Sequence, residues 1–134
     1  MTERLRVVIA EDDDGLADLI RTTLDGDGRF EVVARAANGD DAVALAGEHH
    51  PDLVLMDIAM PGCNGIEATR LIHRFDSSQH VVIYTGSDEF GDVIAAEAAG
   101  AAGYLHKQAL HSPDLPDALL VLHRNFELAL PDLD

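Results

Sequence analysis

The stretch Leu53-Val54-Leu55-Met56-Asp57 decides the fold, because four apolar residues run directly into a carboxylate and the turn residues Pro61-Gly62 follow shortly afterwards. An uninterrupted apolar run of this length predicts a parallel strand that is buried on both faces of a sheet. The acid then lies at the carboxyl end of the strand, which is the edge where open α/β sheets bind ligands. Asp57 is therefore the first candidate functional residue.

Two further apolar runs also end in polar side chains. Val7–Ala10 leads into Glu11-Asp12-Asp13, and Val81–Tyr84 leads into Thr85 and Gly86. Because the carboxyl ends of parallel strands meet at one edge of a sheet, we expect these acids and this hydroxyl to lie near Asp57.

Strand-like runs alternate with helix-like stretches along the whole chain, which is typical of parallel strands joined by crossover helices. The expected fold class is α/β, a doubly wound (βα)5 flavodoxin-like parallel sheet with strand order 2-1-3-4-5. The expected strands cover residues 5–10, 30–35, 53–57, 81–85 and 103–106.

Turn and capping residues predict where the helices between these strands begin and end. The first helix should run from about Gly15 to Leu24, with the Gly26-Asp27-Gly28 turn after it. Asn38 and Asn64 should cap the second and third helices. The remaining signals are Ser87 or Asp88 as the cap of a fourth helix that ends near Gly100, and Ser112, Pro113, Asp114 and Pro116 around the start of a last helix with Leu119, Leu122 and Phe126 facing inward.

Length and charge limit the classes of protein that the chain can represent. Its 134 residues suit one domain, which we expect to cover residues 1–128 with a tail at 129–134. With 25 acidic and 9 basic residues the net charge is −16, which should repel nucleic acid and anionic membranes. A lone Cys63 cannot form an internal disulfide, and we expect no targeting segment or membrane span and a cytoplasmic location.

A carboxylate cluster at the sheet edge predicts a cation site. Two unit charges ~4 Å apart at an effective dielectric of ~20 repel by about 4 kcal/mol, so Glu11, Asp12 and Asp57 need a cation or a proton. An all-oxygen site suits Mg²⁺, which bridges readily to a phosphate. Asp57 is then the best nucleophile for a phosphoryl group, while Thr85 and Lys107 are positioned to contact its oxygens.

The ordered set of motifs resembles a response-regulator receiver domain of two-component signalling, of the chemotaxis-regulator type. The resemblance extends from Arg6 to about Phe126, and each motif alone is weak whereas the ordered set is specific. The matching segments are Val7–Asp13, Pro51–Asp57 with Met60-Pro61-Gly62 and Gly65, Val82–Thr85, and Gly100–Lys107.

The resemblance implies a role for each matching residue. Glu11 and Asp12 correspond to the acidic metal-binding pair, and Asp57 to the phosphoacceptor, which also binds Mg²⁺. The main-chain carbonyl of Ala59 would complete the metal site.

The remaining matches concern the phosphoryl group and the switch. Thr85 corresponds to the hydroxyl that follows the phosphoryl group, and Lys107 to the lysine that contacts it. Tyr104 corresponds to the aromatic residue that couples phosphorylation to the surface made by the fourth helix, fifth strand and last helix.

The function implied is that of a switch. A histidine kinase or histidine phosphotransfer protein would supply the phosphoryl group to Asp57, and a downstream protein or a second copy would bind the surface described above. Such a domain promotes its own phosphorylation and dephosphorylation and is not a turnover enzyme.

Three positions bear on the details of this resemblance. Gln108 stands where the family often has Pro. Ala59 and Ser87 occupy the positions at which the family adjusts the lifetime of the phosphoryl group. Because Ala59 has no polar side chain to position a water, we hypothesise that this lifetime depends mainly on solvent access and on Ser87.

Other classes of protein remain possible. A phosphatase with an aspartyl nucleophile typically has a second acid two residues later, where this chain has Ala59. A degenerate receiver acting as a phosphorylation-independent docking module would be expected to lack part of the Glu11, Asp57, Thr85 and Lys107 set. Asp25-Gly26-Asp27-Gly28 is interpreted as a turn, because a calcium loop needs Gly and Glu at later positions that are absent here.

Overall fold

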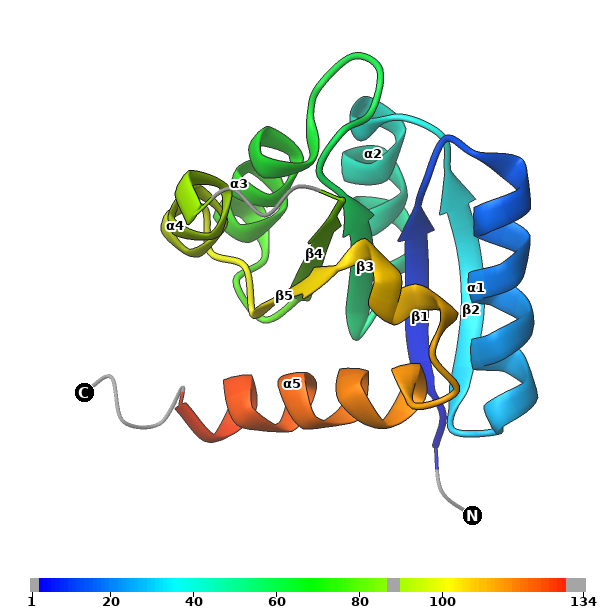
Figure 1. Cartoon of the computed structure of the whole chain (residues 1–134). Coiled ribbons are helices and arrows are strands. Elements are labelled where there is room, and N and C mark those ends of the chain that lie inside the picture. The colour runs from blue at the N-terminus through cyan, green and yellow to red at the C-terminus, as the bar shows by residue number, and fades with distance from the viewer. Residues whose placement is uncertain (1–2, 87–89, 130–134) are drawn as a thin grey trace.

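Five parallel strands form one sheet in the order β2-β1-β3-β4-β5, as predicted (Figure 1). The structure is a computed structural model, and it describes residues 3–86 and 90–129. Each strand lies within one residue of its predicted bounds. The strands are β1 (Leu5–Ala10), β2 (Phe30–Ala36), β3 (Leu53–Asp57), β4 (His80–Thr85) and β5 (Gly103–His106).

Helices cover both faces of the sheet (Figure 1). Residues of α1 and α5 pack in one apolar cluster on one face, and residues of α2, α3 and α4 pack in a second cluster on the other face. Because β1, β3 and β4 lie between these layers, their apolar residues are buried, except for the partly buried Leu5 at the start of β1. The helices are α1 (Asp14–Asp27), α2 (Gly39–His49), α3 (Gly65–Phe75), α4 (Phe90–Ala98) and α5 (Leu115–Ala129), with a 3-10 helix at Lys107–His111.

Two of the predicted helix caps are confirmed. The side-chain oxygen of Asn38 accepts the N–H three residues later at 2.8 Å, and that of Asn64 does the same at 2.9 Å. Each side chain satisfies an N–H that has no partner inside its helix. Asp13 caps α1 in the same way, so the acidic segment after β1 also starts a helix.

The predicted end of the first helix is wrong. Helix α1 continues past Leu24 through Gly26 to Asp27, and it ends at Gly28 with φ of 90°. One glycine inside a helix costs only about 1 kcal/mol, whereas the left-handed conformation of Gly28 stops the helix. Leu19 of α1 is 37% exposed, whereas Leu16, Ile20 and Leu24 on the same helix are buried.

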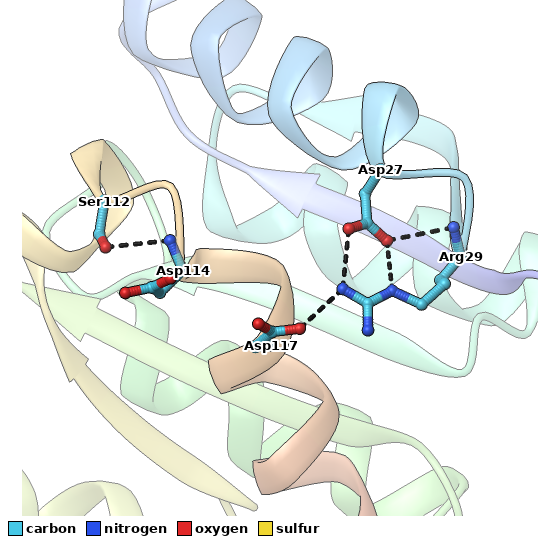
Figure 2. Close-up of polar contacts among 5 residues, drawn as sticks. All are labelled: Asp27, Arg29, Ser112, Asp114 and Asp117. Carbon is cyan, nitrogen blue, oxygen red and sulfur yellow. Dashed lines mark hydrogen bonds and ion pairs between the residues drawn. The ribbon is translucent and has the colours of Figure 1, made fainter.

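A charged contact joins the end of α1 to the start of α5 (Figure 2). The Arg29 guanidinium donates to both carboxylate oxygens of Asp27, at 2.6 and 2.8 Å, and to Asp117 at 2.8 Å. Close by, the Asp114 N–H donates to the Ser112 hydroxyl at 3.1 Å, in the turn that precedes α5. The Arg29–Asp117 ion pair thus links the first turn of α5 to the end of α1.

Some predictions fall on parts of the chain that the structure does not describe. Ser87 and Asp88, the expected caps of α4, and the side chain of Phe126 lie outside the described residues, as does the tail from residue 130 onward. Helix α5 extends to Ala129, one residue into the expected tail. Within the described residues, no helix is both long enough and apolar enough to cross a membrane.

Candidate functional site

The candidate site lies at the carboxyl edge of the three central strands. Asp57 is the last residue of β3 and pairs with Tyr84 of β4, and Glu11 follows β1 on the other side of β3. Side chains alternate between the two faces of a strand, so Asp57 lies on the same face as Leu53 and Leu55. By the same alternation, Glu11 lies on the face of Val7 and Ile9. These four apolar residues belong to the cluster shared with α1 and α5. Tyr84 belongs to that cluster too, so these side chains form a row across one face of the sheet.

The three acids predicted to bind a cation do come together. One carboxylate oxygen from each of Glu11, Asp12 and Asp57 lies within 4.8 Å of the others. Glu11 is 0% exposed and Asp57 is 4% exposed, while Asp12 is exposed at the rim. Grouped carboxylates with this burial are unfavourable without a balancing positive charge, and an all-oxygen set of this kind fits Mg²⁺.

Both carboxylate oxygens of Glu11 are held by donors from the protein. The Tyr84 hydroxyl donates to Oε1 at 2.6 Å, and the Asp13 N–H donates to Oε2 at 2.9 Å. Burial nevertheless raises the pKa of Glu11 above its ordinary value, since these two hydrogen bonds offset it only in part. Glu11 is therefore fixed in one orientation at the floor of the site.

Asp57 is held differently on its two sides. The Ala59 N–H donates to Oδ1 at 3.1 Å, and the Lys107 ammonium lies 3.8 Å from Oδ2. Burial raises the pKa of Asp57, and the Ala59 N–H and the Lys107 charge act against that shift. Oδ2 is thus the carboxylate oxygen of Asp57 that faces the Lys107 ammonium.

Lys107 is the residue directly after β5, and its side chain extends toward Asp57. It begins a 3-10 helix, Lys107–His111, and its side chain is 41% exposed. The N–H of Gln108 donates to His106 Nδ1 at 3.2 Å, so the chain turns directly after the strand. Lys107 therefore lies beside Asp57 with Gln108, and not Pro, as the next residue of the turn.

The two predicted switch residues lie on neighbouring strands. Thr85 is the last residue of β4 and is buried, one position beyond the partner of Asp57. Tyr104 on β5 pairs with Ile83, is half-buried and packs against the cluster shared with α2, α3 and α4. Ser87, expected to influence phosphoryl lifetime, lies outside the described residues.

The loop after Asp57 is packed closely at two glycines. A Cβ at Gly65 would lie 2.3 Å from the Asp57 carbonyl oxygen, and a Cβ at Gly39 would lie 1.7 Å from the Cys63 carbonyl oxygen. Only glycine allows these approaches of one backbone to another. Burial and nearby acids raise the pKa of the Cys63 thiol, which suits a loop residue with no nucleophilic role.

Two residues of the site were not identified from the sequence. Tyr84 was noted only as the end of a strand, and Arg35 of β2 was not singled out. The Arg35 guanidinium donates to the Glu11 carbonyl from Nε at 3.0 Å and from Nη2 at 2.8 Å, and to Asp14 at 2.7 Å. A tyrosine at the end of a buried strand needs a partner for its hydroxyl, and that signal points to a nearby acid.

Comparison with known proteins agrees with this geometry. Residues 7–119 match the family described as the response regulator receiver domain. The chain belongs to this family. The receiver domain is 37% identical over 114 residues to the chemotaxis protein CheY of Halobacterium salinarum, covering 85% of this chain and 92% of that protein.

Other relatives are longer proteins. The chain is 38% identical over 106 residues to the transcriptional regulatory protein DegU of Brevibacillus brevis, covering 78% of this chain and 44% of that protein. The chain thus spans about half the length of the transcriptional regulators it matches. Among solved structures, the signal receiver domain of the putative response regulator NarL of Mycobacterium tuberculosis superposes with a TM-score of 0.86 at 28% identity, over 91% of this chain and 98% of that one.

Family membership bears on the acidic cluster of Glu11, Asp12 and Asp57. Receiver domains are signalling modules of two-component systems, and they bind Mg²⁺ at an acidic pocket. In this chain Glu11, Asp12 and Asp57 have the donor atoms and the proximity to hold such an ion.

Proposed function

We propose that this receiver domain accepts a phosphoryl group on Asp57 from a phosphohistidine of a histidine kinase or histidine phosphotransfer protein. The observation that carries the proposal is the position of Asp57, which is buried, lies within 4.8 Å of two other acids and has Lys107 at 3.8 Å. A buried carboxylate between a cation site and a lysine is arranged for an attack on phosphorus.

The residues divide the chemistry between them. Because the Ala59 N–H holds Oδ1, Oδ2 is the attacking oxygen, and the new O–P bond forms as the N–P bond of the donor histidine breaks. The electron pair of the broken bond passes to the imidazole, which takes a proton. Lys107 and the Thr85 hydroxyl would stabilise the phosphoryl oxygens.

Glu11 and Asp12 would hold Mg²⁺ together with Asp57 and the main-chain carbonyl of Ala59. When bound, Mg²⁺ would neutralise the repulsion between the acids and the incoming phosphoryl group. The acidic cluster therefore makes phosphoryl acceptance dependent on the ion.

The phosphoryl group would then alter the surface made by α4, β5 and α5. Thr85 is the last residue of β4, which pairs with β5, and Tyr104 lies on β5. A shift of Thr85 toward the phosphoryl group would therefore change the packing around Tyr104. Ile94 of α4 is 55% exposed and Val121 of α5 is 54% exposed, which provides apolar contacts for a downstream protein or a second copy. Phosphorylation shifts a pre-existing equilibrium of this surface.

Mass spectrometry tests the chemistry. Wild-type protein, Asp57→Asn and Asp18→Asn are incubated with a small acyl phosphate, with and without Mg²⁺. Asp18 is an exposed acid of α1 and serves as the matched control. A phosphoryl adduct that needs Mg²⁺, is absent in Asp57→Asn and persists in Asp18→Asn is expected. Its absence on folded wild-type protein would favour a phosphorylation-independent docking module.

Hydrogen exchange tests the switch. Amide protection in α4, β5 and α5 is compared with and without beryllofluoride as a phosphoryl mimic, in wild-type protein and in Asp57→Asn. We expect a change in protection confined to the wild type. Identical protection, together with unchanged self-association in sedimentation, would contradict the switching model.

A further inference from the structure

The side chain of Tyr84 crosses the floor of the acidic site. Its strand, β4, is separated from β1 by β3, and neighbouring strands lie about 4.8 Å apart, so β4 and β1 are roughly 10 Å apart. The Tyr84 hydroxyl nevertheless reaches Glu11 Oε1 at 2.6 Å. Since Asp57 is the residue of β3 that pairs with Tyr84, the phenol must pass beside Asp57 on the same face of the sheet.

Tyr84 also contacts the site through its backbone. Its carbonyl accepts the N–H of Ile58 at 3.0 Å, directly after Asp57 in the chain. The residue that follows it is Thr85. Tyr84 therefore contacts Glu11 after β1 and holds the backbone of Ile58 after β3. It also directly precedes Thr85, whose hydroxyl lies at the end of β4.

The environment of Tyr84 makes its position rigid. The residue is fully buried, and its ring packs in the cluster that contains Leu110, Leu115 and Leu119. A buried hydroxyl that lost its partner would cost free energy, so the contact with Glu11 is maintained. Because the ring cannot move away, the hydroxyl determines where Glu11 Oε1 lies.

We infer that Tyr84 is a positioning residue for Mg²⁺, which acts by holding Glu11 at a fixed place beside Asp57. The inference rests on the proposed function, because it assumes that the acidic cluster binds the ion. Partners that orient a metal-binding side chain typically contribute a factor of 10–100 to metal affinity. Without the hydroxyl, Glu11 keeps the Asp13 N–H on Oε2 but loses the donor that fixes Oε1, so the carboxylate can rotate away from Asp57 and Asp12.

The test compares Mg²⁺ binding in Tyr84→Phe and in wild-type protein by calorimetry with Mg²⁺ alone. We expect Tyr84→Phe to bind Mg²⁺ about 10-fold more weakly. Thr69→Val is the matched control, because it removes another buried hydroxyl, one that donates to the Gly65 carbonyl at 2.7 Å. Thr69→Val should bind Mg²⁺ as the wild type does, even if both variants unfold more easily.

A double-mutant cycle shows whether Tyr84 acts through Glu11. In a Glu11→Ala background, Tyr84→Phe should change Mg²⁺ affinity by less than about twofold, since the residue through which it acts is gone.

The outcomes separate this inference from the proposed function. If Tyr84→Phe loses stability yet binds Mg²⁺ with wild-type affinity, Tyr84 is only structural and the inference fails, while phosphoryl acceptance on Asp57 stands. If wild-type protein neither binds Mg²⁺ nor forms the adduct, both fail. A weaker affinity that disappears in the Glu11→Ala background supports the inference.

Discussion

The guanidinium of Arg35 donates two hydrogen bonds to the main-chain carbonyl of Glu11, from Nε at 3.0 Å and from Nη2 at 2.8 Å. Arg35 lies on β2, next to the strand that precedes Glu11. Arg35 of the edge strand β2 therefore holds the main chain of Glu11. Tyr84 of β4, on the other side of β1 and β3, holds the side chain of Glu11.

Replacing Arg35 should loosen the acidic segment. Arg35→Met removes both charge-assisted hydrogen bonds to the Glu11 carbonyl, and we expect the free energy of unfolding to fall by about 1–3 kcal/mol. Urea denaturation measures this loss. Asp14→Asn is the control: it removes only the exposed partner of Arg35 and should cost under about 1 kcal/mol. Equal losses in the two variants would contradict a specific role of the carbonyl contact.

Asp57→Asn should stabilise the fold at neutral pH in the absence of Mg²⁺. Burial raises the pKa of Asp57, so between its unfolded value of about 3.9 and its folded value the folded protein binds more protons. The free energy of unfolding of the wild type therefore falls as pH rises through that window. Because Asn carries no charge, the variant avoids this loss.

The pH dependence of that difference is the diagnostic measurement. Denaturation of both proteins from neutral pH down to about 4 should show the advantage of Asp57→Asn shrinking as Asp57 takes up its proton. Asp27 and Asp76, whose pKa values are lowered by hydrogen bonds from Arg29 and Ser78, titrate alike in both proteins and cancel. An advantage that stays constant with pH would show that the charge of Asp57 is not its cause.

Gly65→Ala should damage both fold and site. The added Cβ would lie 2.3 Å from the Asp57 carbonyl oxygen, and the collision is with backbone that cannot easily move. We expect a loss of roughly 1–3 kcal/mol and slower adduct formation on Asp57. Gly47→Ala is the control within α2, because its Cβ would make only an ordinary contact with Phe75 at 3.7 Å. It should stabilise the helix by about 0.5–1 kcal/mol, as measured by denaturation.

Ala59→Asn should shorten the lifetime of the phosphoryl group. The side chain of Ala59 is exposed, so Asn fits there, and its N–H contacts Asp57 at 3.1 Å. A polar side chain at this position can orient a water for attack on phosphorus. Timing the loss of the adduct by mass spectrometry checks this, and an unchanged rate would refute the hypothesis that solvent access and Ser87 set the lifetime.

The sequence predicted the sheet and the acids because both depend on local patterns. Apolar runs bounded by turn residues give the strands, and the register of parallel strands places Glu11 and Asp57 at the same edge. The end of α1 was missed because glycine inside a helix costs little. Whether Gly26 or Gly28 ends the helix depends on which one adopts positive φ.

The contacts of Tyr84 and Arg35 depend on tertiary structure and were not predicted. Tyr84 reaches Glu11 across an intervening strand, over 73 residues of sequence, and periodicity carries no information about such a reach. Arg35 occupies a strand position at which a basic residue ordinarily faces solvent. Its direction toward the Glu11 carbonyl follows from strand register and side-chain rotamer, which the sequence pattern leaves open.

The wide spacing of the site along the chain has a consequence for biosynthesis. Glu11 and Lys107 lie at opposite ends of the sequence that forms the sheet. Strands that are neighbours in the sheet are separated in the sequence by long segments that contain a helix. Chains dominated by such non-local pairing fold slowly, and they emerge from the ribosome N-terminus first. When Glu11, Asp12 and Asp57 have emerged from the ribosome but β5 has not, the nascent chain has the negative charge of the acids without the balancing charge of Lys107. Under the proposed function, competence to receive a phosphoryl group would arise only with the last strand, so an incomplete chain would not compete with finished copies for the donor.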